Sequence, residues 1–548
     1  MENDKSIPGG NQSGNNMYSY QEEQKVPVVE ANAIRRSLGE GNPNAIQDYQ
    51  INNNYEINQE RVINQNSQLI QSGQNPPLYW MFFIIFGIIQ IVIIILLANY
   101  YDWDYFNDPQ KINDNNDKVL NKIENKYKLF QEINIIILLG FGLLRSFLKH
   151  HSWTSIALTF IGGVLSFEFG LFTLICWGGI FKKQWQNGKF NYEHLLDSNY
   201  CSAANIISLG AFLGKISLTQ YLFIILFETI FSTFNYVLLR QQLRIIDIGG
   251  ALTVHLFGSV FGAIFSIILF LTKNERDKIK YSPHFGSSYN SNILAIFGTL
   301  ILISYWPSFN TALIENQEYK SLGIINTYLA ILGSIVGTFC ISSIYNLGKI
   351  KIKDILNSCF TGAIIISGCC HIINHIWVSI LLGAICGGLI TFLCNFISDR
   401  LKRKGFYDTS DTIYYHGIPS FFGGIVTTIV VRTFENIKEN ETNKKKKLYD
   451  YIGTIMNSNY TDFESQTENI NMSNYAAIHF TGIFISITIA LVSGFVSGFA
   501  IRFSNCKNLN YFFNDSEFFD INDNEHEPFP WEDEQIQLQK HYISRDGP

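Results

Sequence analysis

The sequence has little charge for its length. Asp, Glu, Lys and Arg make up 16% of the 548 residues, whereas 47% are hydrophobic and 15% are aromatic. Repeated long apolar runs with so few charges argue against an ordinary multidomain soluble protein and predict a polytopic membrane protein surrounded by lipid. The formal net charge of −6 says little about partners, because membrane proteins are oriented by loop Lys and Arg. No nucleic acid is expected as a partner.

The sequence also lacks the patterns of metal, redox or covalent chemistry. Eight of the nine cysteines lie in or beside apolar runs, and Cys506 follows the last run. The pair Cys369-Cys370 followed by His371 lacks the usual ligand spacing, so neither a disulfide framework nor a metal site is expected. The aqueous segments contain no nucleophile with a base and no phosphate-binding glycine loop. No cofactor and no enzyme activity are therefore predicted.

Both ends of the chain are polar. Residues 1–75 are rich in Asn, Gln and Ser and have too little apolar surface for a core, which predicts a disordered tail. The chain starts MENDKS without an apolar region, so no cleavable signal peptide is expected. Residues 502–548 are acidic and aromatic, with carboxylates from Asp515 to Glu534. This tail is either solvated or a contact strip for a partner under the membrane.

Between the tails, the apolar runs predict twelve membrane-spanning helices. The first, Trp80 to Ala98, is free of charge and at about 1.5 Å per residue reaches about 28 Å, enough to cross a bilayer. The other predicted spans cover about 133–148, 154–179, 201–214, 217–239, 248–272, 291–306, 321–346, 355–372, 375–397, 416–434 and 474–501. The even number predicts that both termini lie on one side.

Loop charges predict that this side is the cytoplasm. The loops expected there carry basic clusters, namely Lys149, KNERDKIK (273–280), KIKIK (349–353) and RLKRK (400–404). The 435–472 loop does not fit this rule, because it carries the basic run KKKK (444–447) on the opposite, exoplasmic side. It also contains three glycosylation sequons, which suit an exoplasmic face and begin at Asn440, Asn459 and Asn471.

Two Asp-His units stand at the mouths of apolar spans. Asp247 precedes His255 by eight residues and Asp408 precedes His416 by the same interval, and a glycine pair accompanies each unit. An ionisable group in hydrocarbon is costly unless it faces a cavity or a partner. The units fall in the sixth and eleventh spans, which predicts two inverted five-helix repeats plus one extra N-terminal helix. The two histidines would then face each other across one pore.

Each residue of these units also has a plainer interpretation. A single buried histidine is often hydrogen-bonded to a neighbouring helix, although two matching units make this less favourable. An Asp just before a helix start is a good N-cap, because it accepts hydrogen bonds from exposed N–H groups. Asp247 and Asp408 are therefore expected to be structural carboxylates first and to add negative potential at a pore mouth second.

Six stretches of the chain carry a family resemblance. They are LFQEINIIILLGFGLLRSFLK (129–149), NYCSAANIISLGAFLGK (199–215), DIGGALTVHLFGSVFG (247–262), GTLILISYWPSFNTAL (298–313), INTYLAILGS (325–334) and YYHGIPSFFGGIV (414–426). With them, the chain resembles the Rh glycoprotein branch of the ammonium transporter, methylammonium permease and Rh superfamily. The stretches follow the family order from about residue 80 to 434, and twelve spans fit this branch.

The resemblance implies an ammonium transporter-like fold and a homotrimer with one narrow, mostly apolar pore through each protomer. Each pore would carry ammonia, with carbon dioxide as a second candidate. The resemblance further implies that His255 and His416 are hydrogen-bonded twin histidines lining the pore, and that Asp247 lies near the outer vestibule. It also implies that the plasma membrane is the location, although an internal membrane would suit the same pore.

The resemblance assigns an aromatic gate as well. Phe309 would be one member, with Trp306 as its neighbour on the vestibule side. The other member falls on Tyr200, where the family usually has Phe, and the preceding Asn199 is commonly Asp in the Rh branch. A phenol can still stack, but its hydroxyl needs a partner, so this departure leaves the gate rather than the fold in question.

A dry pore of this kind would separate ammonia from potassium by chemistry. A bare cation is excluded from an apolar medium, whereas neutral ammonia crosses with the help of hydrogen bonds to neutral imidazoles. The first alternative is a non-conducting Rh-like scaffold or ammonium sensor that uses the acidic tail and the 435–472 loop as contact surfaces. The second alternative is a twelve-span enzyme or receptor, which the missing motifs disfavour.

Overall fold

The computed structural model describes residues 76–103, 116–183, 188–190, 192–269, 286–314, 316–404, 406–435, 474–503, 515 and 519. The predicted N-terminal tail 1–75, most of the 435–472 loop and nearly all of the acidic tail lie outside these residues. The three sequons at Asn440, Asn459 and Asn471 lie outside them too. The chain divides into two compact units, 1–81 and 82–548, and of the first only the start of one helix, 76–81, is described.

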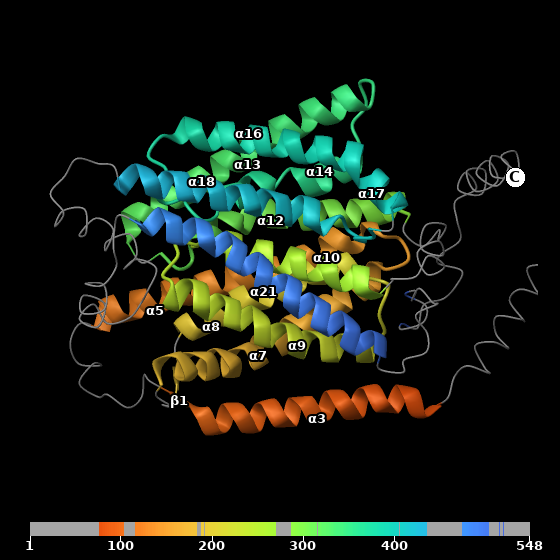
Figure 1. The fold of residues 1–548 in the computed structure, drawn as a ribbon, viewed down its shortest axis with the longest axis vertical. Coiled ribbons are helices and arrows are strands. Elements are labelled where there is room, and N and C mark those ends of the chain that lie inside the picture. Colours follow the sequence, from red (N-terminus) through yellow and green to blue (C-terminus); the bar gives the residue numbers. More distant parts are fainter. Residues whose placement is uncertain are drawn as a thin grey trace, which may run out of the picture. The chain divides into compact units, whose positions relative to one another are not determined.

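The described chain is almost entirely helical (Figure 1). Its first six membrane segments are formed by α3 (Pro76–Tyr100), α5–η1–α6–η2 (Asn116–Phe147), α7 (Ser152–Lys182), α8 (Tyr192–Phe212), α9–η3 (Leu218–Gln242) and η4–α10 (Ala251–Leu269). The next six are formed by α12 (Tyr289–Thr311), α13 (Gln317–Tyr345), α14 (Ile352–Ser358) with α15 (Thr361–Ile365), α16–η6–α17 (Ile376–Arg403), η7–α18 (Ile413–Glu435) and α21 (Tyr475–Phe503). One short parallel ladder pairs β1 (Tyr101–Trp103) with β2 (Gly188–Phe190).

Helices thus occupy each of the twelve predicted segments. Among the described residues, nine helices are long and apolar enough to cross a membrane. Helix α8 is not among the nine, because its buried residues include polar ones such as Asn199, Asn205 and Ser208. Such a helix meets protein rather than lipid, so its sequence does not need to be uniformly apolar.

The ninth predicted segment differs from a continuous span. Helix α14 ends at Ser358 and α15 at Ile365, and the chain then continues in turns to Ile372. The segment is buried almost throughout, and a Cβ atom on Gly362 would overlap the Ala330 carbonyl oxygen of α13. Because protein surrounds it, its free backbone groups find partners that lipid would not offer.

Helices α13 and α16 lie side by side (Figure 1). Their close approach depends on small residues: a Cβ atom on Gly333 would overlap the Ile380 carbonyl oxygen, and one on Gly383 would overlap that of Ala330. Small residues let helix backbones pack closely in membranes, where dispersion replaces the hydrophobic effect between helices.

A described residue of the acidic tail contacts the start of α7. The Asp515 carboxylate accepts hydrogen bonds from the backbone N–H groups of Trp153 (3.1 Å) and Thr154 (2.8 Å) and from the Thr154 hydroxyl (2.7 Å). The local His151 provides no side-chain cap for this helix. A carboxylate distant in sequence therefore satisfies donors that the helix leaves open.

The packing of α13 on α16 gives a first prediction. Gly383→Ala should lower the stability of the purified protein by about 1–3 kcal/mol, because the added methyl group meets backbone that cannot rotate away. Fluorescence-detected size-exclusion chromatography after heating measures the loss. Gly178→Ala is the matched control, because a Cβ atom on Gly178 of α7 meets nothing within 4 Å. Equal melting temperatures for both variants would contradict this account of the contact.

Candidate functional site

The two predicted histidines lie on two π-helical turns. His255 belongs to η4 (Ala251–Leu256), which leads into α10 (Phe257–Leu269), and His416 belongs to η7 (Ile413–Gly417), which leads into α18 (Ile418–Glu435). Both side chains are at most 4% exposed. Single π-turns within helices are rare and frequently occur at functional sites.

Each π-turn is capped by the Asp of its unit. Asp247 accepts hydrogen bonds from the N–H groups of Leu252 (3.0 Å) and Thr253 (2.8 Å) and from the Thr253 hydroxyl (2.7 Å). Asp408 accepts one from the Ile413 N–H (2.7 Å). The backbone donors lie five and six residues after Asp247 and five residues after Asp408. Each carboxylate therefore satisfies backbone donors at the start of the turn that follows it.

A backbone hydrogen bond also joins each of these two helix starts to the end of another helix. The N–H of Gly249, beside Asp247, donates to the carbonyl of Ser367 just after α15 (2.9 Å). The N–H of Ser410, beside Asp408, donates to the carbonyl of Gly210 near the end of α8 (3.0 Å). The start of η4 is therefore bonded to the segment after α15, and the start of η7 is bonded to the end of α8.

The histidine rings lie together at the centre of this arrangement. Their centroids are 5.4 Å apart and their planes differ by 15°. The expected hydrogen bond between them is not formed: both ring nitrogens of His255 and Nδ1 of His416 are buried without a partner. Because the rings are nearly parallel but unbonded, three polar nitrogens have no protein group to bind.

The predicted gate residues are brought together next to His255. The rings of Tyr200 on α8 and Phe309 on α12 stack with centroids 4.7 Å apart at 24°, and both side chains are at most 2% exposed. The Tyr200 hydroxyl donates a hydrogen bond to the Phe309 backbone carbonyl. His255 follows at 6.0 Å from the Phe309 ring. The phenol therefore has a partner, which ties the two gate residues to each other.

Trp306 lies deeper than its predicted vestibule-side position. Its ring stacks on His255 (5.6 Å, 23°) and on Phe360 (5.0 Å, 18°). Because Trp306 is one helical turn from Phe309 on α12, it reaches the level of the histidine pair rather than beyond the gate. Phe360 also contacts His416 (5.7 Å), as does Phe141 (5.8 Å). The pair is thus surrounded by aromatic rings, of which the sequence predicted Trp306 but not Phe141 or Phe360.

Two buried cations near the Asp408 end were also missed. Arg145, 4% exposed, donates through Nη2 to the Ile207 carbonyl (3.2 Å). Lys215, between α8 and α9, donates to the carbonyls of Ala211 (2.9 Å) and Tyr407 (2.8 Å) and to the Ser266 hydroxyl (2.8 Å). Burial lowers the pKa of Lys215 to about 7, although the charge of Asp408 opposes the shift. In the sequence, both charged residues lie inside or next to apolar runs, which is the pattern that would have marked them as candidates.

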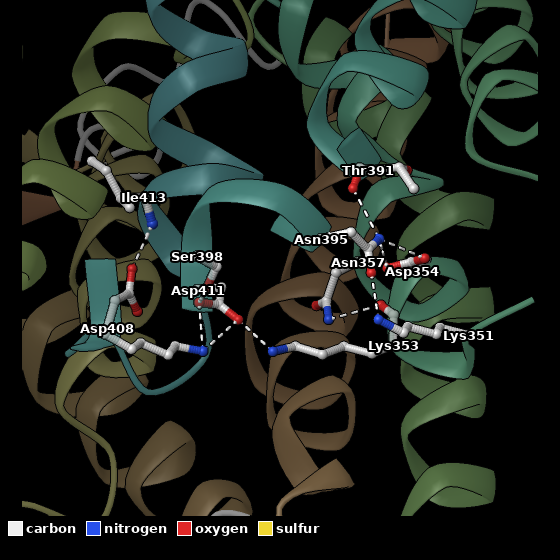
Figure 2. Close-up of polar contacts among 11 residues, drawn as sticks. Lys351, Lys353, Asp354, Asn357, Thr391, Asn395, Ser398, Asp408, Asp411 and Ile413 are labelled. Carbon is white, nitrogen blue, oxygen red and sulfur yellow. Dashed lines mark hydrogen bonds and ion pairs between the residues drawn. The ribbon is translucent and has the colours of Figure 1, made fainter. Parts of the chain in front are cut away.

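A polar network surrounds Asp411, just before the His416 turn (Figure 2). Its carboxylate pairs with Lys353 and with Lys402 (2.9 Å) and accepts a hydrogen bond from the Ser398 hydroxyl (2.6 Å). Burial raises the pKa of Asp411, but the two lysines outweigh burial and hold the pKa below its usual range. The backbone at Asp411 is left-handed (φ 54°), a conformation that Asp tolerates better than most residues.

A second part of the network continues to α16. Asn395 donates to both carboxylate oxygens of Asp354 (3.1 and 3.0 Å) and to the Thr391 carbonyl (2.9 Å), and it accepts from Lys351 (2.6 Å). These contacts join α14 to α16, while Asp411 joins the loop before η7 to both. The basic clusters 349–353 and 400–404 are therefore partly structural.

Among the described residues, no group of three or more His, Cys, Asp or Glu side chains is arranged to hold a metal ion. The cysteines in this part of the chain are unpaired thiols.

Comparisons with known proteins agree with this architecture. Residues 115–501 match the model of the Ammonium Transporter Family. The chain is similar to Ammonium transporter Rh type A of the dog, Canis lupus familiaris, with 30% identity over 59% of this chain and 77% of that protein. It is also similar to Ammonium transporter Rh type C of Homo sapiens, with 25% identity over 78% of this chain and 86% of that protein.

Solved structures share the fold. The Rh50 protein of Nitrosomonas europaea superposes with a TM-score of 0.59 at 22% identity, over 78% of this chain and 98% of that one. Mep2 of Saccharomyces cerevisiae superposes with a TM-score of 0.53 at 16% identity, over 72% of this chain and 88% of that one. The overall fold is therefore one that distant sequences also adopt.

The Asp411 network gives a second prediction. Asp411→Asn should lower the stability at neutral pH by about 1–3 kcal/mol, because two lysines lose their shared counter-charge. The lowered pKa means that Asp411 stabilises the fold above its unfolded-state pKa and that this stabilisation is lost as the pH falls through the folded-state pKa. The difference between wild type and variant should therefore shrink below about pH 4. Thermal melts at several pH values measure it.

Two controls separate charge from backbone strain. Lys349→Gln removes an exposed charge from the same basic region and should leave the melting temperature unchanged. Asp411→Gly relieves the left-handed backbone but removes the ion pairs, so it should resemble Asp411→Asn. A more stable glycine variant would show that strain, rather than the lysine pairs, dominates at this position.

Proposed function

The chain belongs to the ammonium transporter family, which consists of transporters and channels rather than enzymes, and on that premise we propose that it is an Rh-type channel conducting ammonia. It is a multi-pass integral membrane protein. The proposed route runs past the Tyr200–Phe309 gate and along His255 and His416. Carbon dioxide is a second candidate substrate for the same route.

The observation that carries this proposal is the set of unpartnered ring nitrogens beside the gate. His255 and His416 place three such nitrogens inside a lining of Trp306, Phe141 and Phe360. A buried polar atom without a partner is costly in a membrane protein and is unusual unless it serves a ligand. Ammonia, with three donors and one acceptor, is small enough and polar enough to be that ligand.

Selectivity follows from the same chemistry. Ammonium and potassium have similar size and charge, so a wet, charged pore would pass both. The gate rings and the aromatic lining oppose any bare cation, because its water would have to be removed without replacement. Ammonium can shed a proton and pass as ammonia, whereas potassium has no neutral form.

The crosswise hydrogen bonds support two inverted five-helix repeats, α5–α10 and α12–α18, with α3 as an additional helix. The Gly249–Ser367 and Ser410–Gly210 contacts are the equivalent pairs that such a repeat requires. The π-turns that end α9 and α16 also fall at equivalent places. A homotrimer with cytoplasmic termini in the plasma membrane, glycosylated on the 435–472 loop, remains the expected setting.

One contact favours the alternative of a non-conducting scaffold or sensor. The Tyr200 hydroxyl is bonded to the Phe309 carbonyl, so the gate rings are tied as well as stacked. Opening the gate would then require breaking a buried hydrogen bond in addition to unstacking the rings. The retained histidine pair favours conduction, and the gate decides how fast it is.

Replacing His255 by Phe should abolish ammonia flux. Phe fills the space but offers no acceptor, so the internal alkalinisation of proteoliposomes under an inward ammonia gradient should fall at least about tenfold towards that of empty liposomes. Stopped-flow fluorescence of an internal pH dye measures the rate. His375→Phe is the matched control, because His375 is exposed at the start of α16. A His255→Phe rate equal to that of wild type would exclude this route.

Tyr200→Phe tests the gate. Removing the hydroxyl breaks the hydrogen bond to Phe309 but keeps the ring stack, so the flux should rise. One hydrogen bond of about 1 kcal/mol corresponds to an increase of about fivefold. Tyr221→Phe is the control, because the buried Tyr221 hydroxyl has no partner. If Tyr200→Phe conducts at the wild-type rate, the hydroxyl does not restrict the gate.

A further inference from the structure

A positive charge of the protein itself lies against the gate. The Arg240 guanidinium carbon is 5.9 Å from the centroid of the Tyr200 ring and 4.8 Å from that of the Tyr236 ring. Arg240 belongs to η3 (Val237–Gln242), at the end of α9, and is 4% exposed. Both distances lie within the range of about 6 Å over which an aromatic ring attracts a cation.

Hydrogen bonds hold the guanidinium at this position. Arg240 Nη1 donates to the Tyr236 hydroxyl (2.8 Å), and that hydroxyl donates to Asp197 Oδ1 (2.5 Å). Asp197 lies on α8, one turn before Tyr200. The rings of Tyr200 and Tyr236, together with the Asp197 carboxylate, therefore surround the Arg240 guanidinium. We call this arrangement the aromatic seat, because two rings and a carboxylate would also suit a free organic cation or ammonium.

The second nearby carboxylate does not offer another cation site. Asp197 and Asp247 are the two carboxylates whose charges act on Arg240. Asp247 is fully buried, and both of its oxygens accept hydrogen bonds from the start of η4. Of these two carboxylates, Asp197 is therefore the one that would stabilise a cation beside the gate, and Arg240 is already there.

We propose that Arg240 determines the substrate form at the gate, because its guanidinium fills the aromatic seat over Tyr200 and Tyr236 and so prevents ammonium from binding there. The inference rests on the proposed ammonia channel and deepens it. With the seat filled, the gate captures no cation and takes up ammonia directly as the neutral gas. The flux of the wild-type protein then follows the ammonia concentration and is insensitive to ammonium.

The test uses cation binding as a readout that does not depend on conduction. Thermal melts of the purified full-length protein are recorded in methylammonium chloride and in sodium chloride at equal ionic strength. A ligand that binds the folded state raises its melting temperature. Wild type should show no difference between the two salts, whereas Arg240→Met, which keeps the volume and removes the charge, should be stabilised by methylammonium.

Flux at constant ammonia provides the second readout. Lowering the pH from about 8 to about 6 at a fixed ammonia concentration raises ammonium about 100-fold. Wild-type proteoliposomes should conduct at a rate that changes less than about twofold. Arg240→Met should conduct about fivefold faster at the lower pH, because the emptied rings now collect ammonium next to the gate.

Two control variants distinguish the effect of a cation over the two tyrosine rings from the effect of positive charge in general. Arg240→Lys keeps a cation over the rings and should behave as wild type in both assays. Arg244→Met removes one positive charge four residues away and should also behave as wild type. Absence of methylammonium stabilisation in Arg240→Met, or equal stabilisation in Arg244→Met, would overturn the proposal. Stabilisation of Arg240→Met without flux in any variant would support the seat but refute the ammonia channel.

Discussion

The structure depends on satisfying backbone donors at two helix starts that are buried inside the protein. A helix leaves its first N–H groups without partners, and hydrocarbon supplies none. Asp247 and Asp408 meet this requirement by turning their carboxylates onto the π-turns that carry His255 and His416. The histidine pair is therefore a consequence of two capped starts facing each other.

The remainder of the site follows from this arrangement. Once the helix donors are satisfied by Asp, the imidazoles are not needed as structural partners, and three of their nitrogens stay unbonded. The aromatic residues around them, with Trp306 stacked on His255, exclude water and oppose charge. Polar atoms inside an apolar lining are the combination that a small neutral polar molecule requires, and both Asp carboxylates of the units are occupied with backbone donors rather than with the histidines.

The sequence predicted the parts of this arrangement that have a local signature. Long uncharged runs predicted the spans, equal Asp-His spacing predicted two related turns, and an Asp just before a helix start predicted a cap. It did not predict what depends on packing. Nothing local indicates that the 355–372 segment is broken, because its burial by α13 is what permits the break. The depth of Trp306 and the missing bond within the histidine pair likewise depend on how helices from two halves meet.

Buried cations were visible in the sequence, but their roles were not. Arg145, Lys215 and Arg240 all interrupt or border apolar runs, yet only the fold places Arg240 over the gate rings and Lys215 against three oxygen acceptors. The most direct test of a dry ammonia pore records internal pH and membrane potential together in wild-type proteoliposomes, first under an ammonium gradient and then under a potassium gradient. The account predicts alkalinisation faster than in empty liposomes with ammonium and no potential with potassium. A potassium potential, or alkalinisation no faster than in empty liposomes, would contradict it.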